Sequence, residues 1–484
     1  MTTPGLNHDN NSIFTRRRDI VYQFCCTAPS DKPIWRVMGI AFALGCFAHL
    51  LIADTWQLSW IVPDIFLLTG AIIVLLRPCA LGFILCIPGL LWPLLFLRDQ
   101  LTQSVLLLLF STSAATALLL PRFSIKDAIQ TWRLILVSTY ALATLHKLNT
   151  DFLNPSTSCA NYGWSEILHT WDIPALTHIS SPLFFDALPG IVIATEALLT
   201  TLYLLRLRRL AWTLAIAFHL PLTMTMAPAF FFVMMIGHIA WAEEEDLTHI
   251  KKLTQSHPKT LAIILCTSLI PGGFSLALTR ITPEPSMVVR ELMIWALLGL
   301  SLSWPITSTW GSFLQRKKSI LTRPSPLAMI TGGFILLHSV LLPYTGKKMH
   351  HAGAMLSNLR TDAGCWNSIV FPESMRLTDD YIRVNSVYFH HPGHDPEYEQ
   401  LLTQQLWSPP QLRQMQRNWC APHNRPFFLQ GTFKNRTFTI EDLCALQPHE
   451  LPFKDAGILN LELFPDALRF QKNLQRACPQ KCIH

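Results

Sequence analysis

The sequence is poor in charge. Only 14% of its 484 residues are Asp, Glu, Lys or Arg, whereas soluble globular proteins carry about 25%. The deficit falls in residues 35–345, where one apolar run follows another, while residues 346–484 have the composition of soluble protein. This pattern excludes a chain that is soluble throughout. The net charge of +7 does not indicate nucleic-acid binding, because the basic residues stand in short clusters between apolar runs.

Two further signals are missing. No Cys-x-x-Cys motif occurs, which argues against a thioredoxin-like redox site. The first 34 residues are polar and the first apolar run is long enough to span a bilayer, so we expect no cleavable signal peptide. We therefore expect a cytoplasmic segment at 1–34, a transmembrane domain at 35–345 and an extracytoplasmic domain at 346–484.

The apolar runs predict a polytopic helical membrane domain, because a spanning helix needs about 20 predominantly apolar residues. The region 209–241 is the least regular, since Pro221 and Pro228 interrupt it. Broken helices are tolerated at membrane depth only where the freed backbone is buried or lines a cavity. We predict eleven spans, at 35–53, 57–76, 78–97, 103–120, 129–148, 186–204, 209–225, 227–241, 259–279, 288–309 and 326–344.

The Lys and Arg residues indicate the orientation of these spans. With the N-terminus in the cytoplasm, 19 of them lie on the inner side and only three in short outer loops. Cytoplasmic segments carry an excess of these residues. An odd number of spans then places residues 346–484 outside.

The cysteines agree with this orientation. Six of them fall on the expected outer side, which is an even number in a compartment that permits disulfides. We expect Cys478 and Cys482 to form a local pair, with free thiols as the alternative. The six are Cys159, Cys365, Cys420, Cys444, Cys478 and Cys482.

Ionisable residues inside the predicted spans are candidates for a functional site, because they are costly in a bilayer. Most fall in the outer half of their span, so we expect a polar cavity that opens outward. The candidates are His49, Asp64, His146, Lys147, Glu196, His219, His238 and His338.

Lys147 is the sharpest of these candidates. Tyr140, Thr144 and Lys147 share one helix face, and a desolvated lysine can act as a general base. The alternative is a lysine at a helix end that extends to the membrane interface. Glu196 lies near the membrane midplane, so its carboxylate must either have a partner or be protonated. Its role is either structural or catalytic. His219 lies two residues before Pro221 and either lines the helix break or is a satisfied core histidine.

Three segments resemble the vitamin K-dependent gamma-carboxylase superfamily, and more closely its bacterial branch, the horizontally transferred transmembrane (HTTM) domain proteins. The first is WRLILVSTYALATLHKLNTDFLNPSTSC at 132–159, with a Lys-Leu-Asn box at its outer end. The second is AFHLPLTMTMAPAFFFVMMIGHIAW at 217–241, similar to the family's Phe-His segment. The third, AMLSNLRTDAGCWNSIVFP at 354–372, is similar to a Ser-Asn-Leu-Arg box where the membrane domain meets the soluble domain.

The resemblance implies that Lys147 occupies the position of the base that deprotonates vitamin K hydroquinone before a substrate glutamate is carboxylated. It also implies a cell inner membrane as the location and a β-rich outer domain. Three positions differ from the carboxylase pattern: His146 replaces the first of two lysines, Phe152 replaces a tryptophan, and Gln103-Ser104 stands where the family has a histidine. The candidate catalytic residues are Lys147, His146, His219 and Glu196, and the candidate cofactor-binding residues are Tyr140 and Arg133.

The outer domain shows a mixed α/β pattern. We predict a strand at 382–389, a helix that begins after Ser408, and a hairpin within 426–440 whose tip is Lys434 and Asn435. IEDLCAL at 440–446 is expected to begin a short helix. We expect a surface loop rather than a metal site at the histidines of this domain, because their spacing matches no zinc signature. These are His350, His351, His390, His391 and His394.

Three functions agree with these features. The first is a membrane carboxylase-like enzyme that modifies a peptide or small molecule at the outer face, with a pocket where Lys147 and His219 converge. The second is a non-enzymatic scaffold, peptide-export accessory or immunity-type protein on the same fold. The third is a transporter. The expected partners are membrane lipids and a peptide substrate, with no nucleic acid. A quinol cofactor is implied by the resemblance alone, and the cofactor and oligomeric state stay open.

Overall fold

The structure is a computed structural model that describes most of the chain. The described residues are 33–52, 61–95, 101–171, 174–224, 228–246, 248, 324–347, 356–389, 396–423, 426–447, 450–452 and 474–482.

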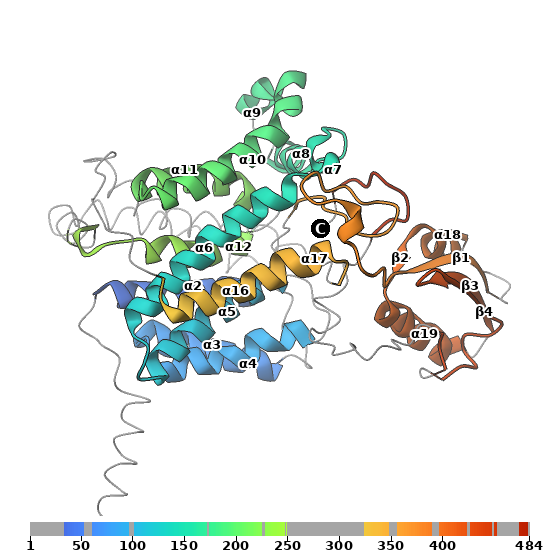
Figure 1. The fold of residues 1–484 in the computed structure, drawn as a ribbon, viewed down its shortest axis with the longest axis horizontal. Coiled ribbons are helices and arrows are strands. Elements are labelled where there is room, and N and C mark those ends of the chain that lie inside the picture. Colours follow the sequence, from blue (N-terminus) through green and yellow to red (C-terminus); the bar gives the residue numbers. More distant parts are fainter. Residues whose placement is uncertain are drawn as a thin grey trace, which may run out of the picture. The chain divides into compact units, whose positions relative to one another are not determined.

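The described part of the region expected to enter the membrane consists of helices joined by short turns (Figure 1). Its elements are α2 (Pro33–Ile52), α3 (Ile61–Leu76), α4 (Ala80–Leu95), α5 (Leu101–Leu119), α6 (Ile125–Lys147), α7 (Thr150–Leu153), α8 (Cys159–Trp171), α9 (Pro174–Ile179), α10 (Pro182–Leu204), α11 (Arg208–Met224), α12 (Pro228–Ala240), α16 (Pro326–Leu336), the π-helix η2 (Leu337–Leu341) and α17 (Leu342–Tyr344).

Among the described residues, three helical segments are long and apolar enough to cross a membrane: Pro33–Leu50, Pro182–Leu204 and Pro326–Tyr344. The other expected spans within the described residues coincide with helices that are too short or too polar to be counted as candidate spans. For example, α3 has 16 residues, which gives about 24 Å of helix against a hydrocarbon core of roughly 30 Å. The predicted spans at 259–279 and 288–309 lie outside the described residues. The structure thus shows a helical domain with three candidate spans.

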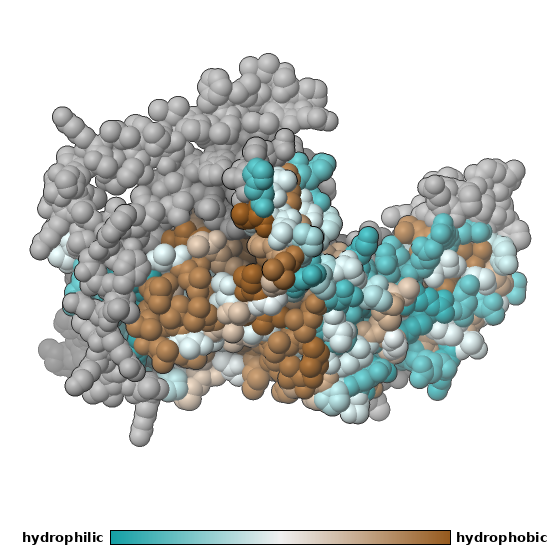
Figure 2. Space-filling model, turned by 90° about the horizontal axis from the view of Figure 1, so that it is seen from above, coloured by the Kyte–Doolittle hydropathy of each residue, from teal (hydrophilic) through white to brown (hydrophobic). Residues whose placement is uncertain are grey.

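By contact density the chain divides into two compact units. The first unit comprises 1–93, 103–137 and 201–332, and the second comprises 94–102, 138–200 and 333–484. Figure 2 shows apolar side chains gathered over the helical region and hydrophilic ones over the C-terminal domain, in agreement with the two compositions.

Aromatic packing holds the first unit together. The rings of Trp35, Phe42, Phe83 and Phe110 surround Trp132 at centroid distances of 5.1–6.3 Å. The indole N–H of Trp132 donates to Phe110 O (3.1 Å), so its polar group is satisfied within the cluster. Between α3 and α4 the backbones approach so closely that a Cβ on Gly70 would lie 2.7 Å from Gly82 O. Small residues allow such close packing of membrane helices.

The C-terminal domain, part of the second unit, is an antiparallel sheet covered by helices. Its elements are η3 (Glu373–Met375), β1 (Ile382–Phe389), α18 (Pro396–Gln404), β2 (Leu406–Trp407), α19 (Pro409–His423), β3 (Phe427–Phe433) and β4 (Arg436–Ile440), and the strand order is β2-β1-β3-β4. The domain core contains Ile382, Val384, Leu402, Leu412, Phe427 and Leu429.

The predicted strand, hairpin and helix start of this domain are confirmed, whereas the predicted short helix is not. β1 has the predicted bounds, and the hairpin turns at Lys434 and Asn435, both with positive φ. α19 begins with a capping box, because Ser408 Oγ accepts from Gln411 N and Gln411 Oε1 accepts from Ser408 N. The short helix expected within 440–446 is wrong. Asp442 Oδ1 accepts hydrogen bonds from Phe427 N and Cys444 N, which favours a turn there instead.

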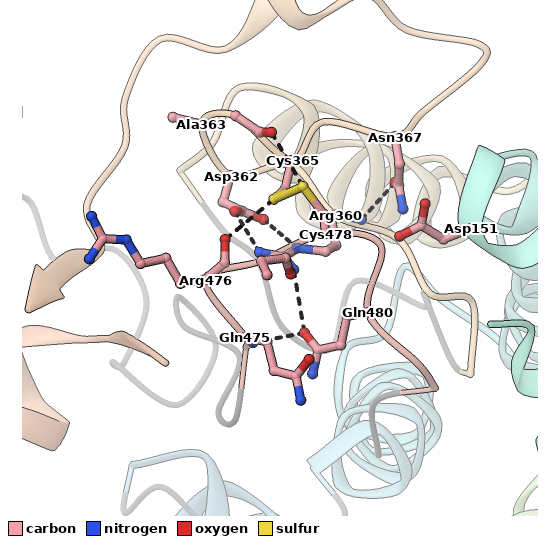
Figure 3. The surroundings of a disulfide bond; sticks show 12 residues. Asp151, Arg360, Asp362, Ala363, Cys365, Asn367, Gln475, Arg476, Cys478 and Gln480 are labelled. Carbon is pink, nitrogen blue, oxygen red and sulfur yellow. Dashed lines mark hydrogen bonds and ion pairs between the residues drawn. A yellow bond between two sulfur atoms is a disulfide. The ribbon is translucent and has the colours of Figure 1, made fainter. Parts of the chain in front are cut away.

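All six cysteines that were expected on the outer side form disulfides: Cys159–Cys482, Cys365–Cys478 and Cys420–Cys444. The expected Cys478–Cys482 pair is wrong. That expectation rested on closeness in sequence alone. Cys482 instead bonds to Cys159 at the start of α8, and Cys478 bonds to Cys365. Between them, Gln480 is buried and accepts a hydrogen bond from Gln475 N (2.8 Å), so the tail is held between its two bridges (Figure 3).

Arg360 is fully buried beside these bridges. Its guanidinium forms two hydrogen bonds with the Asp362 carboxylate, at 2.9 and 2.8 Å, and donates to Ala477 O and to Gln480 Oε1 (Figure 3). A buried ion pair is stable only when further hydrogen bonds satisfy both partners, and this one meets that condition. Arg360 therefore holds the C-terminal tail against the segment 360–362 and contacts it through Ala477 and Gln480.

We expect Arg360→Met to destabilise the second unit by about 3–5 kcal/mol, because it leaves the Asp362 carboxylate buried without its partner. Denaturant unfolding in detergent, followed by tryptophan fluorescence, measures the change. The matched control is Arg376→Met, since Arg376 pairs with Glu373 at the surface and should contribute less than about 1 kcal/mol. Equal losses in the two variants would contradict this assignment.

Candidate functional site

The end of α6 fixes the position of Lys147. Asn149 Nδ2 donates to His146 O (2.7 Å), and Asn149 Oδ1 accepts from Phe152 N (2.8 Å) at the start of α7. One buried side chain thus satisfies the last turn of one helix and the first turn of the next. Helix α6 therefore ends at Lys147, and the hydrogen bonds of Asn149 fix the turn that leads into α7.

Asn149 also joins two of the motifs that carry the family resemblance. Its Nδ2 donates to Ser357 O (2.6 Å) in the Ser-Asn-Leu-Arg box. Asn358 of that box accepts from Cys159 N (2.8 Å) and donates to Thr157 O (2.9 Å). Segments about 200 residues apart therefore meet directly at the base of the outer domain.

Lys147 forms a buried ion pair with Glu196 of α10. Lys147 Nζ and Glu196 Oε1 are 2.9 Å apart, and each side chain is 6% exposed. The ammonium also lies 5.7 Å from the centre of the Phe152 ring. The alternative in which Lys147 extends to the membrane interface is therefore wrong, and Glu196 has the partner that its midplane position requires.

The pair does not use all of its hydrogen-bonding groups. Glu196 Oε2 is buried and has no partner among the described residues. Lys147 Nζ carries three N–H donors, and Glu196 is its one hydrogen-bond acceptor in the described part of the chain. A pair with a purely structural role is expected to be fully satisfied. Tyr140, fully buried on the same helix, lies within electrostatic reach of Glu196.

His146 packs against an aromatic group. Its Nδ1 lies 3.0 Å from the hydroxyl of Tyr344 and its ring stacks on that ring. Tyr344 in turn packs on Phe371, with ring centroids 4.1 Å apart. His146 thus helps to hold the segment after the last candidate span, and this contact gives it a packing role at the position of the family's first lysine.

His219 belongs to the first unit, where aromatic rings surround it. Phe230, Phe231 and His238 lie 5.8–6.4 Å from its ring. His238 in turn shares a short hydrogen bond with the hydroxyl of Tyr203. These contacts favour the interpretation of His219 as a core histidine, and its convergence with Lys147 stays a prediction.

A histidine does lie beside Gln103 and Ser104, although the local sequence has none. His49 of α2 lies 3.3 Å (Nδ1) from Gln103 Oε1 and 3.1 Å (Nε2) from Ser104 Oγ, and all three side chains are buried. The contact could have been predicted from the sequence. The predicted topology places the end of the first span and the start of the fourth span on the same side of the membrane.

Arg133 makes its contacts within the first unit. Its Nε donates to Ala240 O (2.7 Å) and its guanidinium lies 5.2 Å above the Trp241 ring. The described residues contain no group of three or more His, Cys, Asp or Glu side chains suited to a metal. Of the outer-domain histidines considered above, none lies in the described ranges.

Comparison with known proteins gives no match to a family model, a curated protein or a solved structure. The resemblance to the carboxylase superfamily therefore stays a prediction from the three sequence motifs.

We expect the Lys147–Glu196 pair to be strongly non-additive. Lys147→Met or Glu196→Leu alone should destabilise the protein by about 3 kcal/mol, because each leaves one buried charge without its partner. The double variant should lie within about 1 kcal/mol of the parent, since apolar side chains of similar size replace an incompletely satisfied pair. Thermal unfolding in detergent provides the measurement, and simple addition of the two single effects would contradict the pairing.

Proposed function

We propose that the chain is a multi-pass protein of a cell inner membrane, with eleven spans, a cytoplasmic N-terminus and residues 346–484 on the outer face. The distribution of Lys and Arg supports this orientation. The three disulfides support it independently, because all of their cysteines fall in segments assigned to the outside, where the compartment permits such bonds.

We further propose that it is a carboxylase-like enzyme in which Lys147 acts as the base. The observation that carries this proposal is the buried and incompletely satisfied Lys147–Glu196 pair. Such a pair gains less stability than apolar side chains would, so its retention is explained if a ligand completes its hydrogen bonds.

The geometry of the pair allows the amine to become a base. Transfer of one proton from Lys147 Nζ to Glu196 Oε1, across 2.9 Å, leaves a neutral amine beside a neutral acid. The neutral amine can then accept the proton of an acidic hydroxyl, which leaves an ammonium group beside the new oxyanion. Glu196 Oε2 can accept a hydrogen bond from a second donor of the ligand. These groups fit a quinol hydroxyl. In the carboxylase family, vitamin K hydroquinone supplies the strong base that removes a proton from a peptide glutamate.

One observation favours the second candidate, a non-enzymatic scaffold, export accessory or immunity-type protein. That function predicts a Lys147 that is simply paired with a carboxylate, and Glu196 provides such a partner. The enzyme needs Glu196 Oε2 to contact a ligand, whereas the scaffold does not. Variants of this pair should therefore lower the amount of modified product only if the protein is an enzyme.

The test is Lys147→Ala and Glu196→Gln in the native host, with mass spectrometry of secreted peptides. We expect the modified product to fall at least about 100-fold in both variants, in the range typical for loss of a general base. Lys434→Ala, at the hairpin tip, is the control and should leave the product unchanged. Identical peptide profiles in the parent and in properly inserted Lys147→Ala protein would exclude the enzyme.

A further inference from the structure

The first unit contains a cavity with a volume of about 260 Å³ that the proposed chemistry does not use. Basic, aromatic and apolar side chains line it together, and they come from α6, from the turn after α10, and from the ends of α12 and α16. The lining residues are Gln130, Arg133, Leu134, Val137, Leu204, Arg206, Arg208, Trp241, Glu243, Pro324 and Ala328. We call this cavity the basic pocket.

The basic pocket carries an excess of positive charge. Three arginines line it, Arg133, Arg206 and Arg208, against the single carboxylate of Glu243. Arg208 forms ion pairs with Glu243 and with Asp246, and Arg209 adds a second cation to the fully buried Asp246 (3.3 Å). The residues that line the basic pocket thus carry three positive charges and one negative charge.

Two buried N–H donors of the basic pocket have no acceptor. Trp241 Nε1 and Arg208 Nε are both inaccessible and unpaired among the described residues. Arg133 is oriented by its Nε bond to Ala240 O and by the Trp241 ring. Buried donors are normally satisfied, so these groups indicate a ligand that brings oxygen acceptors and negative charge.

The backbone at Arg206 shows that its cation is retained at a conformational cost. Arg206 closes α10 in a Schellman motif: Arg206 N donates to Tyr203 O (3.0 Å) and Leu207 N donates to Leu202 O (2.8 Å). The φ of Arg206 is +61°, a conformation in which glycine is favoured. A non-glycine residue there costs about 1–2 kcal/mol. The cap would be better with glycine, so the side chain serves another purpose.

We propose that the basic pocket binds the phosphate of an anionic phospholipid. The excess charge favours a phosphate and disfavours a headgroup that also carries an ammonium group. The apolar part of the lining, Leu134, Val137 and Leu204, suits the glycerol and upper acyl region of a lipid. The Lys and Arg distribution assigns these helix ends to the cytoplasmic side, where basic pockets between membrane helices recognise anionic headgroups. The lipid source depends on the topology proposed above, but not on the role of Lys147.

The test uses the full chain purified in neutral detergent. Phosphatidylglycerol, phosphatidylcholine or inorganic phosphate is added, and bound lipid is counted by native mass spectrometry while thermal unfolding is followed in parallel. We expect phosphatidylglycerol to bind and to raise the unfolding temperature. Phosphatidylcholine and inorganic phosphate should have little effect.

Arg206→Gly is the decisive variant, because glycine improves the helix cap while it removes the cation. We expect it to fold at least as stably as the parent and to bind phosphatidylglycerol about tenfold more weakly, equivalent to about 1.4 kcal/mol. Arg133→Gln should weaken binding similarly. The control is Arg122→Gln, since Arg122 is exposed and lies outside the lining of the pocket.

Three outcomes would overturn the proposal: equal retention of phosphatidylcholine, unchanged binding in Arg206→Gly, or stabilisation by inorganic phosphate equal to that by the lipid, which would assign the site to a free anion. Lys147→Ala separates this result from the proposed enzyme, because it should lose product in the host while its lipid binding stays intact.

Discussion

A charged side chain buried in an apolar helical protein needs an opposite charge and hydrogen-bond partners. The rest of this structure depends on how many of these partners each buried charge has. The Arg360 guanidinium forms two hydrogen bonds with a carboxylate and two with other acceptors. The desolvation of its charge is therefore offset within the fold. Among the described residues, Lys147 and Glu196 compensate each other but leave the second carboxylate oxygen without a partner. Arg208 is paired twice, and its buried Nε–H has no acceptor in the described part of the chain. The first arrangement is satisfied within the fold, whereas we propose that a ligand completes the other two.

Local features of the fold were predictable from the sequence because their causes are local. β1 follows from a run of β-branched and aromatic residues, and the capping box from Ser408 and Gln411 three residues apart. The short helix within 440–446 failed because the Asp442 side chain competes with the backbone for hydrogen bonds. The disulfide pairing failed because it depends on which distant loops the tail contacts, and a sequence does not show this.

The candidate site was predictable in part. The burial of Glu196 in an apolar run required a partner, but the identity of Lys147, 49 residues away, depends on the packing of α6 and α10. The basic pocket was missed for a different reason. Arg206 and Arg208 were interpreted as a topology signal alone, whereas both also line a cavity. Arg133 was assigned to a cofactor by resemblance, whereas its contacts are with Ala240 and Trp241.

The position of the Lys147 ammonium is linked through a short series of contacts to the covalent closure of the outer domain. Lys147 is the last residue of α6, and Asn149 ends that helix while it bonds to Ser357. The neighbouring Asn358 contacts both Thr157 and the backbone of Cys159, which is bridged to Cys482 in the C-terminal tail. A side chain at a helix end is usually mobile because the last turn frays. Here Asn149 is held by buried hydrogen bonds, and the nearby Cys159 is bridged to the C-terminal tail. These contacts, as well as its own charge, keep the ammonium beside Glu196.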